Sequence, residues 1–228
     1  FFTFLPIFFL YSSGSDKSAE YRTATDLALD YAIPKINGKE TPWAKNLAEE
    51  VKNSFPFSPQ ALTDLSDTNF KEMDFNRKEQ GGEYRKRGND IYDVARRFLP
   101  SRLAKWIAEK GESLDPPSII VRKDLEQPIQ QIMAHEMLHK LFDHSPYGVE
   151  SSKDKTKIEV ANKFGLQWLD EWDSLTEKYP ILHNIDKHIQ KNGYDISDNY
   201  SLATERFAYL GQEALYDKGA DLQGIDII

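Results

Sequence analysis

Two histidines set four positions apart within an apolar stretch constrain the local fold of this chain more than any other feature. The segment reads His135-Glu136-Met137-Leu138-His139, and apolar residues flank it on both sides. On an α-helix, residues i and i+4 lie on one face, so His135 and His139 can present imidazole nitrogens to one cation, with Glu136 beside it. The pattern predicts a buried helix with a metal site on one face, and we expect the charged Lys140 at the rim of a cleft.

The composition narrows the class of protein. At 228 residues the chain is long enough for one good core and at most two small domains, and we expect one globular unit. Its net charge of -8 argues against a nucleic-acid partner, because phosphate contacts require a local surplus of Lys and Arg. Basic residues gather between positions 77 and 97, but acidic residues alternate with them, which indicates a solvated face. The chain contains no Cys, so His and carboxylate side chains are the available metal donors. We expect a monomer.

The first eleven residues form an apolar run, FFTFLPIFFLY, followed by four small residues, SSGS. The run is too short to span a bilayer, which requires about 20 residues, but its length suits the core of a signal peptide. We therefore expect residues 1–15 to be an export signal or the end of a membrane anchor. This interpretation predicts a secreted or membrane-anchored protein outside the cytoplasm, with any membrane attachment at the N-terminus.

Apolar spacing and helix-ending prolines indicate a predominantly helical α+β fold. A short β-branched run at 118–122 predicts a strand, and residues 58–82 read as a long polar loop that ends at Gly81-Gly82. Helices are expected at 18–32, at 41–55 with Thr41 as N-cap, on either side of Pro100 between 91 and 111, and at 128–142, 157–179 and 201–218. We predict an N-terminal helical region at 16–115, long enough to include a segment that covers the cleft, and a region at 116–228 that carries the metal site.

A catalytic zinc normally holds three protein ligands and leaves a fourth position open, so His135 and His139 need a partner. Two carboxylates on predicted helices compete for this place, Glu159 and Glu205. The remaining histidines are weaker candidates. His183 and His188 lie five positions apart, on different faces of a helix, and we interpret both as ordinary surface or packing residues.

The pattern His135-Glu136-x-x-His139 followed by Glu205-x-x-Ala208-Tyr209 resembles the gluzincin group of zinc metallopeptidases, and the ExxAY form is similar to lethal-factor-like domains. The resemblance covers residues 118–218 and implies a zincin-like fold, with a small sheet beside the histidine helix and further C-terminal helices. In gluzincins a small residue follows the ligand Glu by three positions, because that turn packs closely on the histidine helix. Ala208 occupies this place for Glu205, whereas Asn162 occupies it for Glu159. The resemblance favours Glu205, but Glu159 remains open because its distance from His139 is found in thermolysin-like members.

The resemblance implies a zinc metalloendopeptidase that cleaves a protein or peptide substrate. Zn²⁺ would be held by His135, His139 and Glu205, and Glu136 would be the general base for an activated water. Gluzincins commonly use a Tyr or His to stabilise the oxyanion, and Tyr200 is the first candidate here, before Tyr209 and His144. The strand at Ile119–Val121 is expected to lie at a sheet edge and to bind an extended peptide.

Two other classes of function remain open from the sequence. A non-catalytic sensor or binding module could keep the zincin fold, although such a module has no chemical need for Glu136. A helical structural protein could contain the histidine motif by chance. Stoichiometric zinc would separate this last class from the others, and turnover would separate an enzyme from a binding module.

Overall fold

The computed structural model describes residues 32–33, 35–55, 57–75, 80–125, 128–144, 155–191, 194 and 199–216. The expected export signal and nearly all of the helix expected at 18–32 lie outside these ranges. The chain divides into two compact units instead of the single unit expected, one formed by Phe1–Lys39 with Gly88–Asp115, and the other by Glu40–Arg87 with Pro116–Ile228. The second unit is built from two separate stretches of the sequence, so residues far apart along the chain share one core.

The first unit contains two packed helices, α4 (Asn89–Arg96) and α5 (Ser101–Gly111), and the short 3-10 helix η2 (Glu112–Leu114). Their buried faces carry small and branched apolar residues, among them Ile91 and Ala104. The carboxylate of Asp115 accepts a hydrogen bond from the backbone N–H of Ile91, with 2.9 Å between Oδ2 and N. This contact satisfies a free N–H at the start of α4. The prediction of two helices separated at Pro100 is confirmed.

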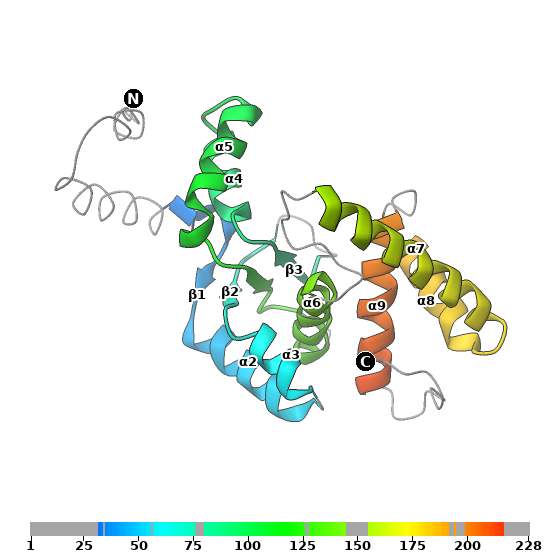
Figure 1. The fold of residues 1–228 in the computed structure, drawn as a ribbon. Coiled ribbons are helices and arrows are strands. Elements are labelled where there is room, and N and C mark those ends of the chain that lie inside the picture. The colour runs from blue at the N-terminus through cyan, green and yellow to red at the C-terminus, as the bar shows by residue number, and fades with distance from the viewer. Residues whose placement is uncertain are drawn as a thin grey trace. The chain divides into compact units, whose positions relative to one another are not determined.

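The second unit contains a mixed four-stranded sheet with the order β1-β2-β4-β3 (Figure 1). Its strands are β1 (Lys39–Glu40), β2 (Asn69–Glu72), β3 (Gly82–Arg85) and β4 (Ser118–Val121). β4 pairs parallel with β2 and antiparallel with β3, and all four of its residues are buried. A short apolar strand covered on both faces is therefore the centre of the sheet.

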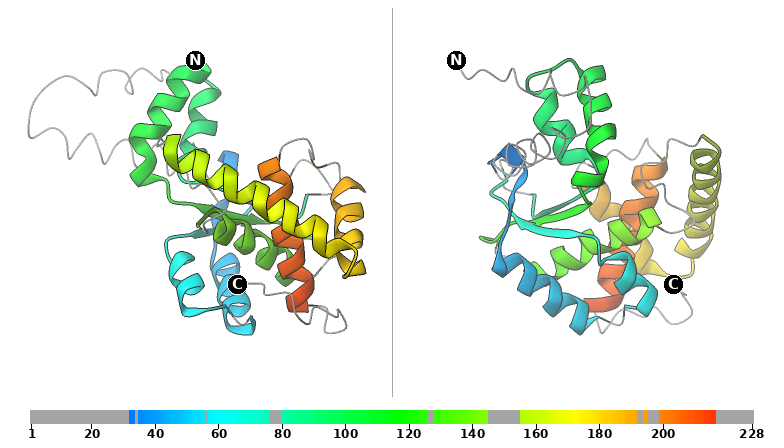
Figure 2. Two further views of the ribbon diagram at one scale, coloured as in Figure 1. Left: turned by 45° about the vertical axis from the view of Figure 1, so that its right-hand side comes forward. Right: turned by 60° about the vertical axis from the view of Figure 1, so that its left-hand side comes forward.

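Six helices complete the second unit as the structure describes it. They are α2 (Pro42–Ser54), α3 (Pro59–Asp64), α6 (Ile129–His144), α7 (Lys155–Thr176), α8 (Pro180–Lys191) and α9 (Asn199–Tyr216). Thr41 caps α2 as predicted, since its Oγ1 accepts a hydrogen bond from the N–H of Ala44 at 3.2 Å. α6 lies between the sheet and α9, and α7 and α8 pack on α9 (Figures 1 and 2).

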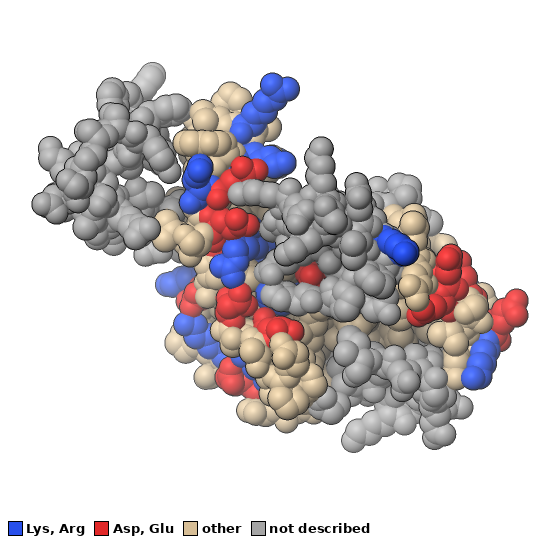
Figure 3. Space-filling view, in the orientation of Figure 1, with Lys and Arg blue, Asp and Glu red and all other residues tan. Residues whose placement is uncertain are grey.

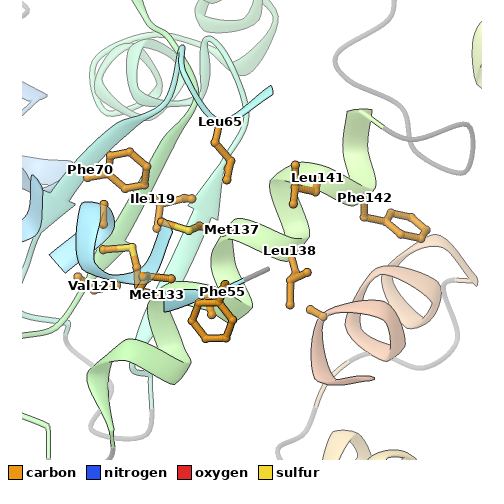
Figure 4. Close-up of a cluster of buried hydrophobic side chains, with 14 of the residues drawn as sticks. Phe55, Leu65, Phe70, Ile119, Val121, Met133, Met137, Leu138, Leu141 and Phe142 are labelled. Carbon is orange, nitrogen blue, oxygen red and sulfur yellow. The ribbon is translucent and has the colours of Figure 1, made fainter. Parts of the chain in front are cut away.

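The main core forms where α6 is covered on two sides (Figure 4). Met133 and Met137 lie toward Ile119 of the sheet, whereas Leu138 and Phe142 lie toward α9. Phe142 contacts Phe207 of α9 with ring centroids 5.3 Å apart. A second cluster joins α7, α8 and α9 and consists of Trp172, Tyr179, Leu182, Ile185, Ile189 and Leu210. α6 and α9 are thus the helices on which the other elements of this unit pack.

The structure confirms a predominantly helical α+β fold with a small sheet beside the histidine helix. It differs from the predicted loop at 58–82, which contains α3 and β2. β2 reads Asn-Phe-Lys-Glu, and one apolar residue gives no alternating pattern, so pairing with β4 decides its conformation. The two units also differ from the predicted regions 16–115 and 116–228. Strands β2 and β3 pair with β4 and therefore bring Glu40–Arg87 into the second unit.

The charged surface agrees with the solvated face expected from the sequence. Over the described residues of the face drawn in Figure 3, Lys and Arg side chains are interspersed with Asp and Glu. Among the described helices, none is both long and apolar enough to cross a membrane.

Replacing Ile119 in the central strand by Ala should lower the free energy of unfolding by about 2–5 kcal/mol, because this fully buried side chain leaves a cavity between the sheet and α6. Urea denaturation followed by circular dichroism measures the change. Leu62→Ala is the control, since Leu62 is 38% exposed and should cost less than about 1 kcal/mol. Equal losses in the two variants would contradict the assignment of β4 to the core.

Candidate metal centre

Helix α6 places the two motif histidines together as the sequence predicts. The Nε2 atoms of His135 and His139 lie 3.0 Å apart, and both side chains are about one-tenth exposed or less. The residues between and around them are apolar and buried, which fixes the polar stripe of α6 toward α9. Two imidazole nitrogens therefore converge in a place largely shielded from water.

Helix α9 adds Glu205 to this pair. Its Oε2 lies 3.5 Å from Nε2 of His135, and its Oε1 lies 3.5 Å from Nε2 of His139. One donor atom from each of the three residues falls within 4.8 Å of the others, a grouping that could hold a metal ion. The buried Oε2 of Glu205 makes no hydrogen bond within the described part of the chain. A buried carboxylate oxygen without a donor fits a cation as its partner.

The second nitrogen of each histidine ring is held by a side chain of α9. Nδ1 of His135 lies 3.1 Å from Oε1 of Gln212, and Nδ1 of His139 lies 2.9 Å from Oγ1 of Thr204. An amide oxygen only accepts, so Nδ1 of His135 carries a proton, and Nε2 is the nitrogen that can offer a lone pair to a cation. Neither Gln212 nor Thr204 is among the residues predicted from the sequence. Gln212 follows Glu205 by seven positions on one helix face, which was the available signal.

Burial and mutual charge set the protonation of this group. Burial lowers the pKa of His139 to about 4, with His135 and Lys86 lowering it further against the charge of Glu205. Burial would raise the pKa of Glu205, but its close contact with His135 and the charges of the two nearby imidazoles hold it below its usual value. Burial would likewise lower the pKa of His135, yet the contact with Glu205 and the charges of Glu136 and Glu205 leave it raised. An ionised Glu205 and a neutral His139 result at neutral pH.

Glu136 lies next to the first histidine and faces strand β3. A Cβ atom on Gly82 would meet Cγ and Oε1 of Glu136 at 2.9 Å, so the glycine allows the strand to approach this carboxyl group. Burial raises the pKa of Glu136 to about 7, and the charges of Glu205 and Glu83 add to this against His135 and a hydrogen bond from the Tyr84 backbone. A carboxyl group that titrates near neutral pH is suited to transferring protons.

The three candidates for an oxyanion donor occupy different places. The hydroxyl of Tyr200 donates to Oδ1 of Asp143, one turn beyond His139 on α6. The ring of Tyr209 packs edge-on against the ring of His135, with centroids 4.4 Å apart. It also packs edge-on against the ring of His188, with centroids 4.8 Å apart. The side chain of His144 lies outside the described residues. The catalytic role of Tyr200 stays a prediction.

Tyr194 is a neighbour of Tyr209 that was not considered from the sequence. It lies between α8 and α9, its side chain is 40% exposed, and its ring centroid is 6.5 Å from that of Tyr209. Burial raises its pKa, and the charges of Glu205 and Glu136 and a hydrogen bond to Tyr209 add to this. The raised pKa keeps its hydroxyl protonated at neutral pH, and a protonated hydroxyl can donate a hydrogen bond. No helical or strand periodicity surrounds Tyr194, so the sequence carried no signal for it.

Two expectations about the surroundings of the site are wrong. Lys140 does not lie at a rim, because its side chain is fully buried with Nζ 3.5 Å from Oδ1 of Asp67. Ile119–Val121 does not form a sheet edge, because β4 pairs on both sides. β3 is the strand at the end of the sheet on the side of Glu136.

Of the two carboxylates that compete as the third ligand, the described residues place only Glu205. Glu205 is brought to His135 and His139. Glu159 belongs to α7, and its side chain lies outside the described residues.

Comparison with known proteins adds nothing to this geometry. No protein-family model matches the chain, and no curated protein and no solved structure is significantly similar to it. Interpretation of the site therefore depends on the chemistry of its own residues.

Replacing Gly211 by Val tests the close approach of α9 to α6. A Cβ atom at Gly211 would lie 2.7 Å from Cδ1 of Leu138, so the branched side chain should overpack the contact and cost about 1–3 kcal/mol of unfolding free energy. Leu138→Ala makes room, so the double variant should lose less than the sum of the single variants in chemical denaturation. Strict additivity would show that the two residues do not share this contact.

Proposed function

We propose that the chain is a zinc-dependent metalloendopeptidase with a zincin-like fold that hydrolyses peptide bonds outside the cytoplasm. The observation that carries the proposal is the convergence of His135, His139 and Glu205 beside Glu136. This is the arrangement that the resemblance to gluzincins implied. The apolar N-terminal run supports the proposed location.

The chemistry of the donors favours zinc over other common ions. Two neutral imidazoles and one carboxylate match the donor set of catalytic zinc sites, which keep a further position open. Magnesium and calcium prefer sites made of oxygen atoms. Gln212 and Thr204 fix the orientation of the two rings, as partners of zinc-binding histidines generally do.

Each residue then has a defined task in hydrolysis. Bound zinc supplies a Lewis acid that makes water nucleophilic near neutral pH. Glu136 takes a proton from the water while the water oxygen forms a bond to the peptide carbonyl carbon. Glu136 then delivers this proton to the amine nitrogen as the carbon–nitrogen bond breaks. Tyr194 can donate its hydroxyl proton in a hydrogen bond to the carbonyl oxygen as negative charge develops there.

The edge strand β3 gives a place for an extended peptide. It pairs with β4 on one side and has no second neighbour in the described sheet. Gly82 brings its first residue against Glu136. A peptide added alongside β3 through backbone hydrogen bonds would therefore lie next to the catalytic carboxyl group.

The purified full chain should hold about one zinc ion per molecule and cleave an unfolded protein substrate. Glu136→Gln should keep zinc but lose cleavage by a factor of about 100 to 10,000, because the general base is removed and the ligands are retained. Metal analysis of the purified variants and a fluorescence assay of cleavage make the two measurements.

Two further variants identify the third ligand. Glu205→Gln should lose most of the bound zinc, whereas Glu159→Gln should retain both zinc and cleavage. A wild-type chain without zinc would refute the metal site. Zinc without turnover would refute the peptidase and support a non-catalytic zincin-fold sensor or binding module.

Tyr194→Phe should reduce kcat by about 100-fold at saturating zinc while leaving the zinc content unchanged, because the lost hydroxyl group contacts the transition state and not the metal. Steady-state kinetics on a peptide substrate measure this. Tyr92→Phe on α4 is the matched control and should cleave at the wild-type rate. A wild-type kcat for Tyr194→Phe would exclude it as the donor.

A further inference from the structure

We propose that Asp143 is a positioning residue that fixes both α9 and the edge strand β3 against the metal-site helix α6. Its effect on catalysis rests on the proposed function, whereas its effect on metal binding requires only that the site holds zinc. The proposal gives a task to three polar residues, Lys86, Asp143 and Tyr200, that the hydrolytic steps above do not use.

Asp143 continues the stripe of metal-binding residues along α6. His135, His139 and Asp143 are spaced by four residues and therefore lie on one helix face. The Asp143 side chain is only 2% exposed, and its Oδ1 accepts a hydrogen bond from the hydroxyl of Tyr200. The same oxygen lies 3.1 Å from Nζ of Lys86. One buried carboxylate thus joins three separate elements.

The contact with Tyr200 completes a polar ladder between α6 and α9. His135 contacts Gln212, His139 contacts Thr204, and Asp143 contacts Tyr200. The residue numbers rise along α6 as they fall along α9, so the helices run in opposite directions and each contact lies at least one turn from the next. Glu205 directly follows Thr204. Removing the contact at Asp143 frees the first turn of α9, and the position of Glu205 then depends on the other two contacts.

The contact between Asp143 and Lys86 holds strand β3 against α6. Lys86 directly follows β3, whose first residue, Gly82, lies against Glu136. The strand is therefore fixed to α6 at both ends, by close packing at Gly82 and by an ion pair at Lys86. Nζ of Lys86 also lies 4.9 Å above the ring of Tyr200, which links β3 to α9. Asp143 thereby fixes the position of the edge strand relative to the proposed zinc ligands.

The environment of Asp143 favours a geometric role over a purely stabilising one. A buried ion pair contributes little net stability, because desolvation of the charges offsets their attraction. Its directional contacts, in contrast, exclude other arrangements of the three elements. Residues that orient metal ligands indirectly typically change metal affinity by about 10- to 100-fold when replaced.

The test compares zinc affinity by chelator competition in the full-length wild-type protein and three variants. Asp143→Asn should raise the zinc Kd by about 10- to 100-fold, and Tyr200→Phe, which keeps the ring, should raise it by about 10-fold. Lys86→Met should leave the zinc Kd near the wild-type value and lower kcat/KM at saturating zinc by about 10-fold, because the edge strand loses its anchor. Circular dichroism of the metal-free variants verifies folding.

Asp67→Asn is the matched control. Asp67 also pairs with two cations, Arg87 and the α6 residue Lys140, but it contacts no residue of α9 in the described part of the chain. It should leave the zinc Kd unchanged. Wild-type Kd values for both Asp143→Asn and Tyr200→Phe would overturn the inference. A reduced kcat with a wild-type Kd in Tyr200→Phe would also overturn it and give Tyr200 the catalytic role. A wild-type protein that binds zinc but cleaves nothing would refute the peptidase alone, since the Kd comparison stands without turnover.

Discussion

The contact between α6 and α9 is the interaction on which the rest of the second unit depends. Three hydrogen bonds join polar side chains of the two helices, and small residues allow them to approach closely. Ala208 is completely buried, and Gly211 lies directly against Leu138. Polar contacts of this kind are costly when buried without partners, so each one selects this single pairing of the helices. The sheet, α7 and α8 then cover the outer faces of the pair.

The sequence predicted the site better than its surroundings. The spacing of His135 and His139 predicted that they share one helix face, and Ala208 favoured Glu205 through the resemblance to gluzincins, in which a small residue follows the ligand Glu by three positions. Thr41 and Pro42 located the start of α2 because capping is a local property. Such features depend on residues within one or two turns.

The features that the sequence did not reveal depend on contacts between distant segments. β2 is a strand because β4 provides its hydrogen-bond partners, and β4 is central because β3 pairs on its other side. The burial of Lys140 follows from Asp67, which belongs to the segment before β2. Tyr194 packs edge-on against Tyr209, whose ring in turn contacts that of His135. No local pattern of apolar and polar residues encodes these relationships.

The order of the elements along the chain also determines when the candidate metal site can form. His135 and His139 are made well before Glu205, and the helix that carries Glu205 also supplies the side chains that orient both imidazole rings. A nascent chain that ends before α9 has two histidines on a helix whose apolar face lacks its cover. During synthesis from the N-terminus, the centre is therefore assembled last, after the sheet and α6 are already available as a surface for α9 to dock on.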